Sequence, residues 1–117
     1  MKEREVIGVV NDQWGSPTYA ADLATVLIRI IRSQKWLPGT FHYSNEGVIT
    51  WYDFASSIKA HTKSNCIINP IPTAAFPTPA KRPGYSVFDK DKIRSAFELN
   101  IPDWQVSLKT CLEKLNT

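Results

Sequence analysis

The sequence predicts a small α/β fold of about four helices and three or four short strands. Apolar residues recur at helical spacing in four segments, and short runs of bulky or β-branched residues lie between them. Hydrophobic residues make up 43% of the 117 residues and charged ones 21%, which is typical of a globular domain and not of a disordered chain. We therefore expect residues 1–117 to form one folded part.

The N-terminal third is expected to contain one strand and one helix. Glu5–Val10 is rich in β-branched residues and predicts a strand that ends in a turn at Asn11-Asp12. Tyr19–Ile31 carries apolar residues three and four apart, which predicts a helix capped by Thr18. Leu37-Pro38-Gly39 ends that segment.

The middle of the chain predicts a second helix between two strands. Thr40–Tyr43 is a run of bulky residues and is expected to be a short strand. Thr50 and Asp53 have the spacing of a capping box, which starts a helix that fades by His61. Asn65–Ile71 predicts another strand.

A proline-rich passage, Pro70–Pro83, follows. Five prolines exclude a helix there, and we expect an ordered, extended loop because Ile71, Phe76 and Tyr85 give it apolar side chains to bury. Tyr85–Phe88 is expected to be a short strand.

Two helices complete the chain, one from Asp89 or Lys90 through Phe97 and one opened by Pro102-Asp103. The predicted strands are few and short for an independent parallel sheet. Part of the sheet is therefore expected to come from residues outside this chain.

The distribution of charge, the length of the apolar runs and the spacing of the cysteines argue against several classes of protein. The net charge is +3, but the cations are scattered and form no basic run, so nucleic-acid binding is not expected. No apolar run is long enough to span a membrane, and charged Met1–Arg4 does not begin a signal peptide. Cys66 and Cys111 have no metal or redox spacing, which favours a reduced, cytoplasmic protein and leaves one disulfide open.

The first candidate site is the loop Asn11–Tyr19, which leads to the start of a helix. Free amides and the positive end of a helix dipole suit a polar or anionic ligand there. A well-capped connecting loop is the alternative interpretation. The candidate contacts are Gln13, Trp14, Gly15, Pro17 and Thr18.

The second candidate site is Thr78–Gly84, where Lys81, Arg82 and Pro83 lie between prolines. Cations on a stiff backbone lose little conformational freedom when they bind a phosphate. A solvated turn with two exposed cations explains the same residues equally well.

The remaining candidates favour structural roles. His42 and His61 are too far apart for a metal site, and no metal is expected. Trp51 and Trp104 lie at helix starts, where they are expected to pack over helix ends.

No catalytic or cofactor-binding group is expected in this chain. The five glycines are too dispersed for a dinucleotide-binding loop, and no tyrosine precedes a lysine by four residues.

Taken in order, the motifs resemble the C-terminal part of the dTDP-4-dehydrorhamnose reductase family, in the extended short-chain dehydrogenase/reductases. The resemblance is collinear from Glu3 to Leu115. It is carried by Val10–Thr18, Ala21–Ala24, Gly39–Ser44, Thr50–Ala55, Pro72-Thr73, Phe76–Ala80, Arg82-Pro83 with Ser86, and Pro102–Gln105.

The resemblance implies an activity and a missing half. Such enzymes reduce dTDP-6-deoxy-L-lyxo-4-hexulose to dTDP-L-rhamnose with NADPH or NADH, and an N-terminal Rossmann domain holds the cofactor and the catalytic Tyr/Lys pair. This chain matches only the lobe that closes over the sugar nucleotide. The resemblance also implies that the loop from Gln13 to Thr18 faces the sugar nucleotide and that the Arg82-Pro83 loop lies near the diphosphate of the sugar nucleotide. Met1–Arg4 would be the tail of a helix that begins upstream.

Two further expectations follow. A fragment of this kind should be inactive alone and should bind no cofactor. It should also expose apolar surface and self-associate. A non-catalytic binding module, like the reductase-like regulatory subunit of methionine adenosyltransferase, is the alternative function, and the upstream sequence would distinguish the two.

Overall fold

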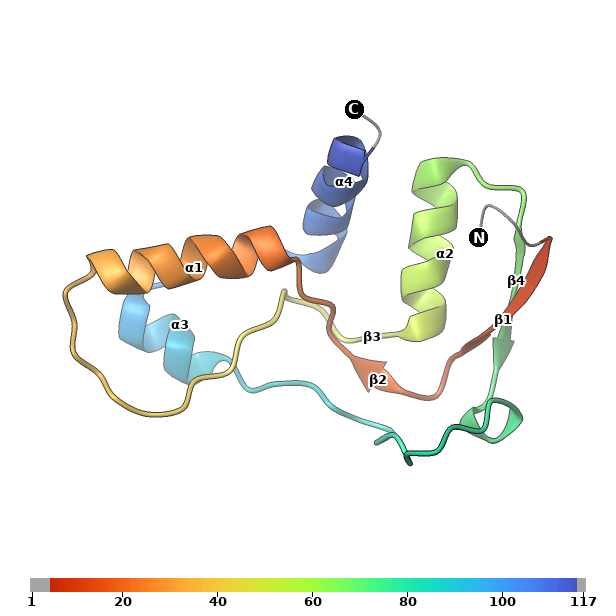
Figure 1. Ribbon diagram of the computed structural model, residues 1–117, viewed down its shortest axis with the longest axis horizontal. Helices are drawn as coiled ribbons and strands as arrows, with labels where there is room; N and C mark the ends of the chain where they lie inside the picture. The colour runs from red at the N-terminus through yellow and green to blue at the C-terminus, as the bar shows by residue number, and fades with distance from the viewer. Residues whose placement is uncertain (1–4, 116–117) are drawn as a thin grey trace.

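The computed structural model describes residues 5–115 as a flat, elongated molecule with extents of 50 × 37 × 20 Å. Its elements in chain order are β1 (Val6–Val10), β2 (Trp14–Gly15), α1 (Ala20–Arg32), β3 (Ile49–Thr50), α2 (Trp51–Thr62), β4 (Ile67–Ile71), a 3₁₀ turn η1 (Thr73–Ala75), α3 (Asp91–Phe97) and α4 (Trp104–Leu115). Figure 1 shows α1 and α3 at one end, β1, β4 and α2 at the other, and α4 between them. Four helices with short strands match the predicted α/β fold. Met1–Arg4, expected to be the tail of a helix, lies outside the described residues.

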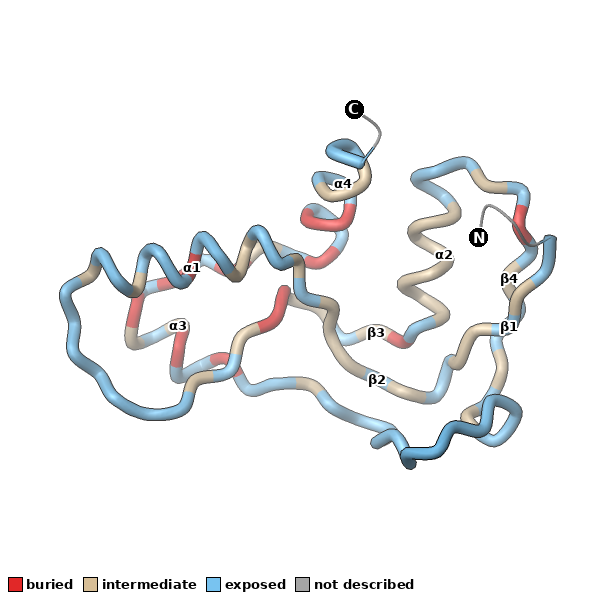
Figure 2. The backbone as a smooth tube through the Cα atoms, in the orientation of Figure 1, coloured by how far each residue is buried: buried red, intermediate tan, exposed pale blue. Residues whose placement is uncertain are grey.

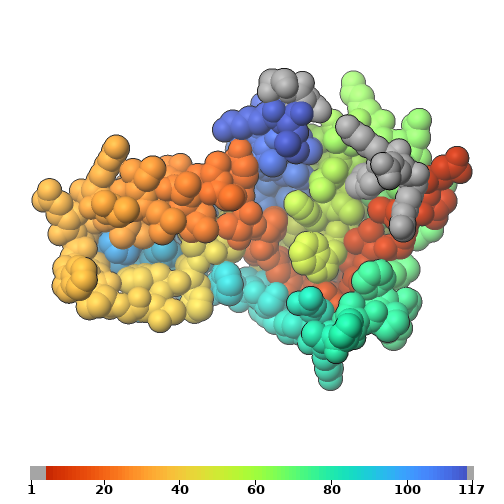
Figure 3. All heavy atoms as spheres, viewed as in Figure 1, coloured from red at the N-terminus to blue at the C-terminus, as the bar shows by residue number. Residues whose placement is uncertain are grey.

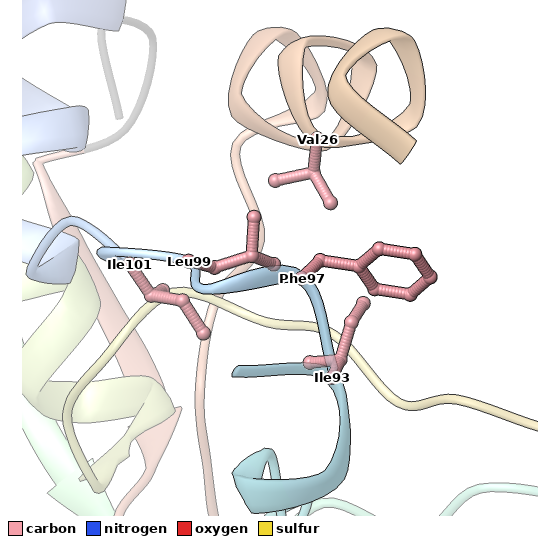
Figure 4. Close-up of a cluster of buried hydrophobic side chains, with 5 residues drawn as sticks. All are labelled: Val26, Ile93, Phe97, Leu99 and Ile101. Atoms are coloured by element: carbon pink, nitrogen blue, oxygen red, sulfur yellow. The ribbon is translucent and has the colours of Figure 1, made fainter. Parts of the chain in front are cut away.

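The chain is more extended than a self-contained domain of its length. Its radius of gyration is 16.7 Å, whereas about 13–14 Å is expected for a compact domain of 117 residues. The buried apolar cluster is correspondingly small and lies under α1, as Figure 4 shows and as the red segments of Figure 2 indicate. Its members are Val26, Ile93, Phe97, Leu99 and Ile101.

β1 and β4 form a parallel pair, with Val6 opposite Ile67 and Val10 opposite Ile71. The amide of Ile67 donates to the carbonyl of Glu5, and the amide of Asn11 donates to the carbonyl of Ile71. α2 lies against both strands and supplies the crossover that a parallel pair requires. Both predicted strands are confirmed.

The start of α2 is set by local chemistry. The Thr50 hydroxyl accepts from the Asp53 amide at 3.1 Å, and the Asp53 carboxylate accepts from the Thr50 amide at 3.0 Å. The predicted capping box is confirmed, and α3 and α4 also begin and end close to the predicted positions.

Two predictions near α1 are wrong. Thr18 does not cap the helix. The Tyr19 amide instead donates to Oδ1 of Asn45, 2.7 Å away and distant in sequence. Thr40–Tyr43 forms no strand, because no strand within residues 5–115 pairs with its backbone, and Phe41 and Tyr43 pack on the buried apolar cluster.

The proline-rich passage also departs from the prediction. It contains the 3₁₀ turn η1, for which Pro72 precedes the first residue and supplies the extended entry. Tyr85–Phe88 forms only a single bridge, from Tyr85 to Trp14. Phe76 and Tyr85 are exposed, because the passage runs along the surface and no other described segment covers it.

Asn45 connects distant segments at the centre of the molecule. Its side chain is fully buried, with 1% of its surface exposed. Its Nδ2 lies 2.8 Å from Oδ2 of Asp22 in α1, 3.0 Å from Oγ of Ser107 in α4 and 3.2 Å from the carbonyl of Pro102. One amide group therefore fixes α1 and α4 to the same loop.

A charged cluster extends this connection to α3. The buried ammonium of Lys90 lies 3.3 Å from the Glu46 carboxylate and 3.1 Å from the carbonyl of Asn45. Arg94 contacts the same carboxylate. Partial burial would raise the pKa of Glu46, but Lys90 and Arg94 outweigh it and hold the pKa below its usual value.

Gly47 follows this cluster at a position that no other residue fits. Its φ is +118°, and a Cβ there would lie 2.3 Å from Cδ1 of Trp104. Trp104 is buried against Phe54 of α2, with ring centroids 6.2 Å apart. The glycine therefore lets α4 pack against α2.

We predict that Gly47→Ala lowers the free energy of unfolding by about 2–4 kcal/mol, because a methyl group adds both backbone strain and a clash with Trp104. The matched control is Gly84→Ala, whose Cβ would meet only the carbonyl of Asp12 at 3.7 Å. Urea unfolding measures both variants. Equal stabilities for the two would contradict this account of Gly47.

We also predict that the Glu46 cluster gives the protein part of its acid sensitivity. Because the folded pKa of Glu46 lies below the ordinary 4.5, its stabilisation is complete above about pH 5 and is lost as the pH falls through the folded value. Glu46→Gln should lower the free energy of unfolding at pH 7 by about 1–3 kcal/mol. The free energy of unfolding should also fall less between pH 5 and pH 3 in this variant than in the parent. Chemical unfolding across this pH range tests it, with Glu113→Gln on α4 as the charge-matched control. A parallel decline in parent and Glu46→Gln would refute the prediction.

Candidate functional site

The short strand β2 brings together three segments that are distant in the sequence. Trp14 pairs with Thr50 and Gly15 with Ile49 in an antiparallel ladder. On the other edge, the Trp14 amide donates to the carbonyl of Gly84 at 2.8 Å, and the Ser86 amide donates to the carbonyl of Trp14 at 2.9 Å. The proline-rich loop and the start of α2 therefore lie on either side of β2, and Figure 3 shows the three segments meeting on one face.

A hollow of about 310 Å³ opens where these segments meet. It is lined by Gln13, Trp14, Gly15, Ser16, Pro17, Ile49, Thr50, Trp51, Phe54, Arg82, Pro83 and Ser86.

The walls of the hollow are largely aromatic. Trp14 and Trp51 keep 43% and 60% of their surface exposed, and Phe54, which also lines the hollow, contacts the ring of the buried Trp104. Trp51 was expected to pack over a helix end, and this expectation is wrong, since its ring is left uncovered beside the hollow. Exposed aromatic faces of this kind suit stacking against a planar ring or the apolar face of a sugar.

Arg82 gives the hollow its charge. It is the one ionisable residue of the lining, which contains no acidic side chain. Arg82 is exposed and has no hydrogen-bond or ion-pair partner within residues 5–115. An unpaired guanidinium can form bidentate hydrogen bonds with a phosphate.

The structure brings together most of the residues expected from the sequence. Gln13, Trp14, Gly15 and Pro17 line the hollow, and so do Arg82 and Pro83 from the second candidate loop. Thr18 and Lys81 do not line it, and both are exposed. Just before α1, the Tyr19 amide is hydrogen-bonded to Oδ1 of Asn45.

Gly15 allows the segments to approach closely. A Cβ at this position would lie 3.0 Å from Oγ of Ser86. A side chain there would have to displace the Ser86 hydroxyl, which also lines the hollow.

Gln13 is held at the rim by its neighbours. Its Nε2 donates to Oγ1 of Thr73 at 3.3 Å, and Thr73 donates from its amide and hydroxyl to the Asp12 carboxylate. These hydrogen bonds from Thr73 lower the pKa of Asp12. The end of β1 is thereby tied to the turn that follows β4.

Sequence reasoning missed five lining residues outside the two candidate loops. They are Ile49, Thr50, Trp51, Phe54 and Ser86, whereas Ser16 lies within the predicted Gln13–Thr18 loop but was not named as a contact. The capping box located the start of α2, but it did not indicate which face of the helix meets β2. A two-residue ladder between β2 and β3 has no periodic signal that a sequence could show.

No metal site is present among residues 5–115, since no three His, Cys, Asp or Glu side chains come together there. His42 stacks on Phe88 with ring centroids 5.0 Å apart, and His61 is exposed on α2. Within the same residues, no helix is long and apolar enough to cross a membrane.

The chain is similar to known proteins over its whole length. The family model for the RmlD substrate binding domain matches residues 1–117. The dTDP-4-dehydrorhamnose reductase of Escherichia coli K12 is 38% identical over 99% of this chain and 42% of its own length.

Solved structures of two reductases have the same fold. A dTDP-4-dehydrorhamnose reductase of Clostridium acetobutylicum superposes with a TM-score of 0.90 at 36% identity, over 99% of this chain and 41% of its own. The Bacillus anthracis enzyme, solved in complex with NADP, gives a TM-score of 0.87 at 38% identity, over 97% of this chain and 39% of its own. The chain thus spans about two fifths of the length of its relatives, and it belongs to the RmlD substrate binding domain family.

Proposed function

We propose that the hollow binds a dTDP-linked 4-keto-sugar and that the chain is the substrate-binding part of a dTDP-4-dehydrorhamnose reductase. The observation that carries the proposal is the unpaired Arg82 beside two exposed tryptophans in a hollow without acidic groups. A diphosphate requires a fixed cation, and a nucleoside or sugar requires a flat apolar surface. The names of the relatives supply the substrate, which the hollow alone does not specify.

The proposed enzyme needs a second, N-terminal part that holds NADPH or NADH. The glycines of this chain are widely spaced, so its residues do not form the phosphate-binding loop of a dinucleotide site. No hydride-transfer step is therefore assigned to these residues. Their proposed role is to bind and orient the sugar nucleotide.

β1 is the proposed docking edge for that part. Parallel sheets rarely consist of two strands, and they are normally covered on both faces. In β4, Ile67 and Ile71 direct their hydrogen-bonding groups toward β1, so Pro70 lies at an outward-facing position where its missing N–H costs no pairing. The outer edge of β4 is thus closed by Pro70, while that of β1 remains available for another strand.

A reducing, cytosolic setting belongs to the same proposal. Both cysteines are free thiols, with Cys66 buried and Cys111 partly buried. Free thiols in a small domain are typical of reducing compartments.

The test combines this chain with the separately produced dinucleotide-binding part of the E. coli relative. The mixture should consume NADPH when dTDP-6-deoxy-L-lyxo-4-hexulose is added, and neither part should do so alone. Tight stoichiometric binding of NADPH by the 117-residue chain in calorimetry would overturn the proposal. So would a mixture that forms a complex and remains inactive, as a regulatory module would.

We predict that Arg82→Gln weakens dTDP binding by roughly tenfold or more, because a charge-assisted bidentate contact to phosphate is lost. Lys81→Gln is the matched control, since it removes an adjacent exposed cation that does not line the hollow. Calorimetry or NMR titration with dTDP measures both. An equal loss of dTDP affinity in the two variants would mean that nonspecific electrostatic attraction holds the ligand and that Arg82 has no specific role.

A further inference from the structure

Gln13 carries a hydrogen-bond acceptor that no other described residue uses. Its Nε2 donates to Oγ1 of Thr73 at 3.3 Å, whereas its Oε1 has no hydrogen-bond partner within residues 5–115. The oxygen is not sealed inside the protein either, because the Tyr43 hydroxyl is the one buried side-chain N or O atom of that range without a partner. Since Gln13 lines the hollow, it offers a ligand an accessible acceptor.

The other polar side chains of the hollow do not offer the same group. Arg82 has only donors. The remaining side-chain oxygens of the lining each take part in a hydrogen bond within the chain already, and they belong to Ser16, Thr50 and Ser86. Among the described residues, Gln13 is therefore the one side chain of the lining with an unused oxygen.

Asp12 decides which end of the Gln13 amide is free. The Thr73 amide donates to both carboxylate oxygens of Asp12 at 3.0 Å, and the Thr73 hydroxyl donates to Oδ1 of the same group. A hydroxyl has one hydrogen, and an ionised carboxylate can only accept. Because Asp12 engages that hydrogen, Oγ1 of Thr73 can only accept from Gln13. The Nε2 group must then face Thr73, and Oε1 is left as the free end.

The charge of Asp12 maintains this order. The hydrogen bonds from the Thr73 hydroxyl and amide hold the pKa of the Asp12 carboxyl below its usual value. At neutral pH the group is therefore ionised and has no hydrogen to donate. A neutral amide in its place could donate to Thr73, and the Thr73 hydroxyl could then donate to Gln13 and turn its amide over.

A purely structural link does not account for the contact to Gln13. The hydrogen bonds between Asp12 and Thr73 already join the end of β1 to the turn η1. The bond from Gln13 adds one neutral contact of 3.3 Å at an accessible side chain, which contributes little stability. Its main effect is to orient the amide.

An acceptor of fixed orientation selects a ligand group that can only donate. A hydroxyl both donates and accepts, so it would pair with either end of an amide. An imide N–H can only donate, and it would face the like donor group if the amide were reversed. In a dTDP moiety the N3–H of thymine is the one group of this kind, since the other donors are hydroxyls. The exposed rings of Trp14 and Trp51 offer flat surfaces for such a base.

We propose that Gln13 is a specificity-determining residue whose Oε1 accepts a hydrogen bond from the N3–H of the thymine base, and that Thr73 and Asp12 are positioning residues that hold its amide in the accepting orientation. This inference rests on the proposed function, which supplies the dTDP moiety. It divides recognition between Arg82, which binds the diphosphate, and Gln13, which reads the base.

The first test compares the binding of dTDP and of N3-methyl-dTDP, which lacks the N–H group, by calorimetry. The parent chain should bind N3-methyl-dTDP roughly tenfold more weakly than dTDP, whereas Gln13→Met should bind both with similar affinity because the acceptor is gone. Gln105→Met, at an exposed position of α4, is the matched control and should keep the affinity ratio of the parent.

The outcomes of this test separate the inference from the proposed function. Equal affinities of the parent for the two ligands would overturn the inference alone. So would a ratio that survives in Gln13→Met, because the methyl group would then be excluded by shape. A parent chain that binds no dTDP would overturn the proposed function and the inference together.

The second test examines the positioning residues through the same affinity ratio. Thr73→Val and Asp12→Asn should lower the ratio to about threefold or less, because the amide is then free to turn, and Thr73→Ser should restore the parent ratio. A merely structural role would weaken the binding of both ligands by the same factor and leave the ratio unchanged. Thr110→Val on α4 is the control, since its hydroxyl donates only to the carbonyl of Val106. A parent-like ratio in Thr73→Val would refute the positioning role.

Discussion

The buried side chain of Asn45 holds the parts of this molecule in place. Its Oδ1 accepts from the amide of Tyr19, the residue just before α1. Its Nδ2 donates to Asp22 of α1, to Ser107 of α4 and to the carbonyl of Pro102. Such a group is costly to bury unless its hydrogen bonds are satisfied. Because its partners come from two segments distant in sequence, residues 19–22 and 102–107, the side-chain amide is satisfied only when α1, α4 and the central loop are assembled together. The small apolar cluster under α1 then adds stability to an arrangement that polar contacts specify.

The same connection fixes the position of the hollow. The backbone amide of Asn45 donates to the carbonyl of Pro17, and the Ser16 hydroxyl donates to the carbonyl of Gly47. The segment that follows β2 is therefore tied to the Asn45–Gly47 loop, while β2 itself pairs with β3 and with the proline-rich loop. Arg82 and the tryptophans are thus held at one place by backbone pairing, although the side chains themselves remain exposed. Backbone pairing allows side chains to stay available to a ligand without loss of position.

What could be predicted from the sequence depended on local signals. The capping box of Thr50 and Asp53 and the periodicity of α1 and α4 act within a few residues, and those elements were predicted correctly. Thr18 fits the same local rule and was predicted wrongly, because the N-cap is Tyr19, whose amide is hydrogen-bonded to Asn45, 26 residues away. Trp51 was missed as a lining residue for a related reason, since its exposure follows from where the two-residue strand β2 pairs. Contacts between distant segments decided these positions, and no single segment encodes them.

The proposed function places binding and catalysis in different parts of the protein. Every residue that lines the hollow belongs to the 13–86 segment, and the contacts that position these residues are internal to the described chain. Within residues 5–115 the outer edge of β1 has no neighbouring strand, and the radius of gyration of 16.7 Å exceeds that of a compact domain of this length. If the proposed function holds, the hollow is formed by this chain alone and would be available to a sugar nucleotide before a cofactor-bearing part docks. Docking along β1 would then contribute the reacting groups and close the hollow from solvent, which strengthens the interaction of Arg82 with phosphate because the local dielectric constant falls.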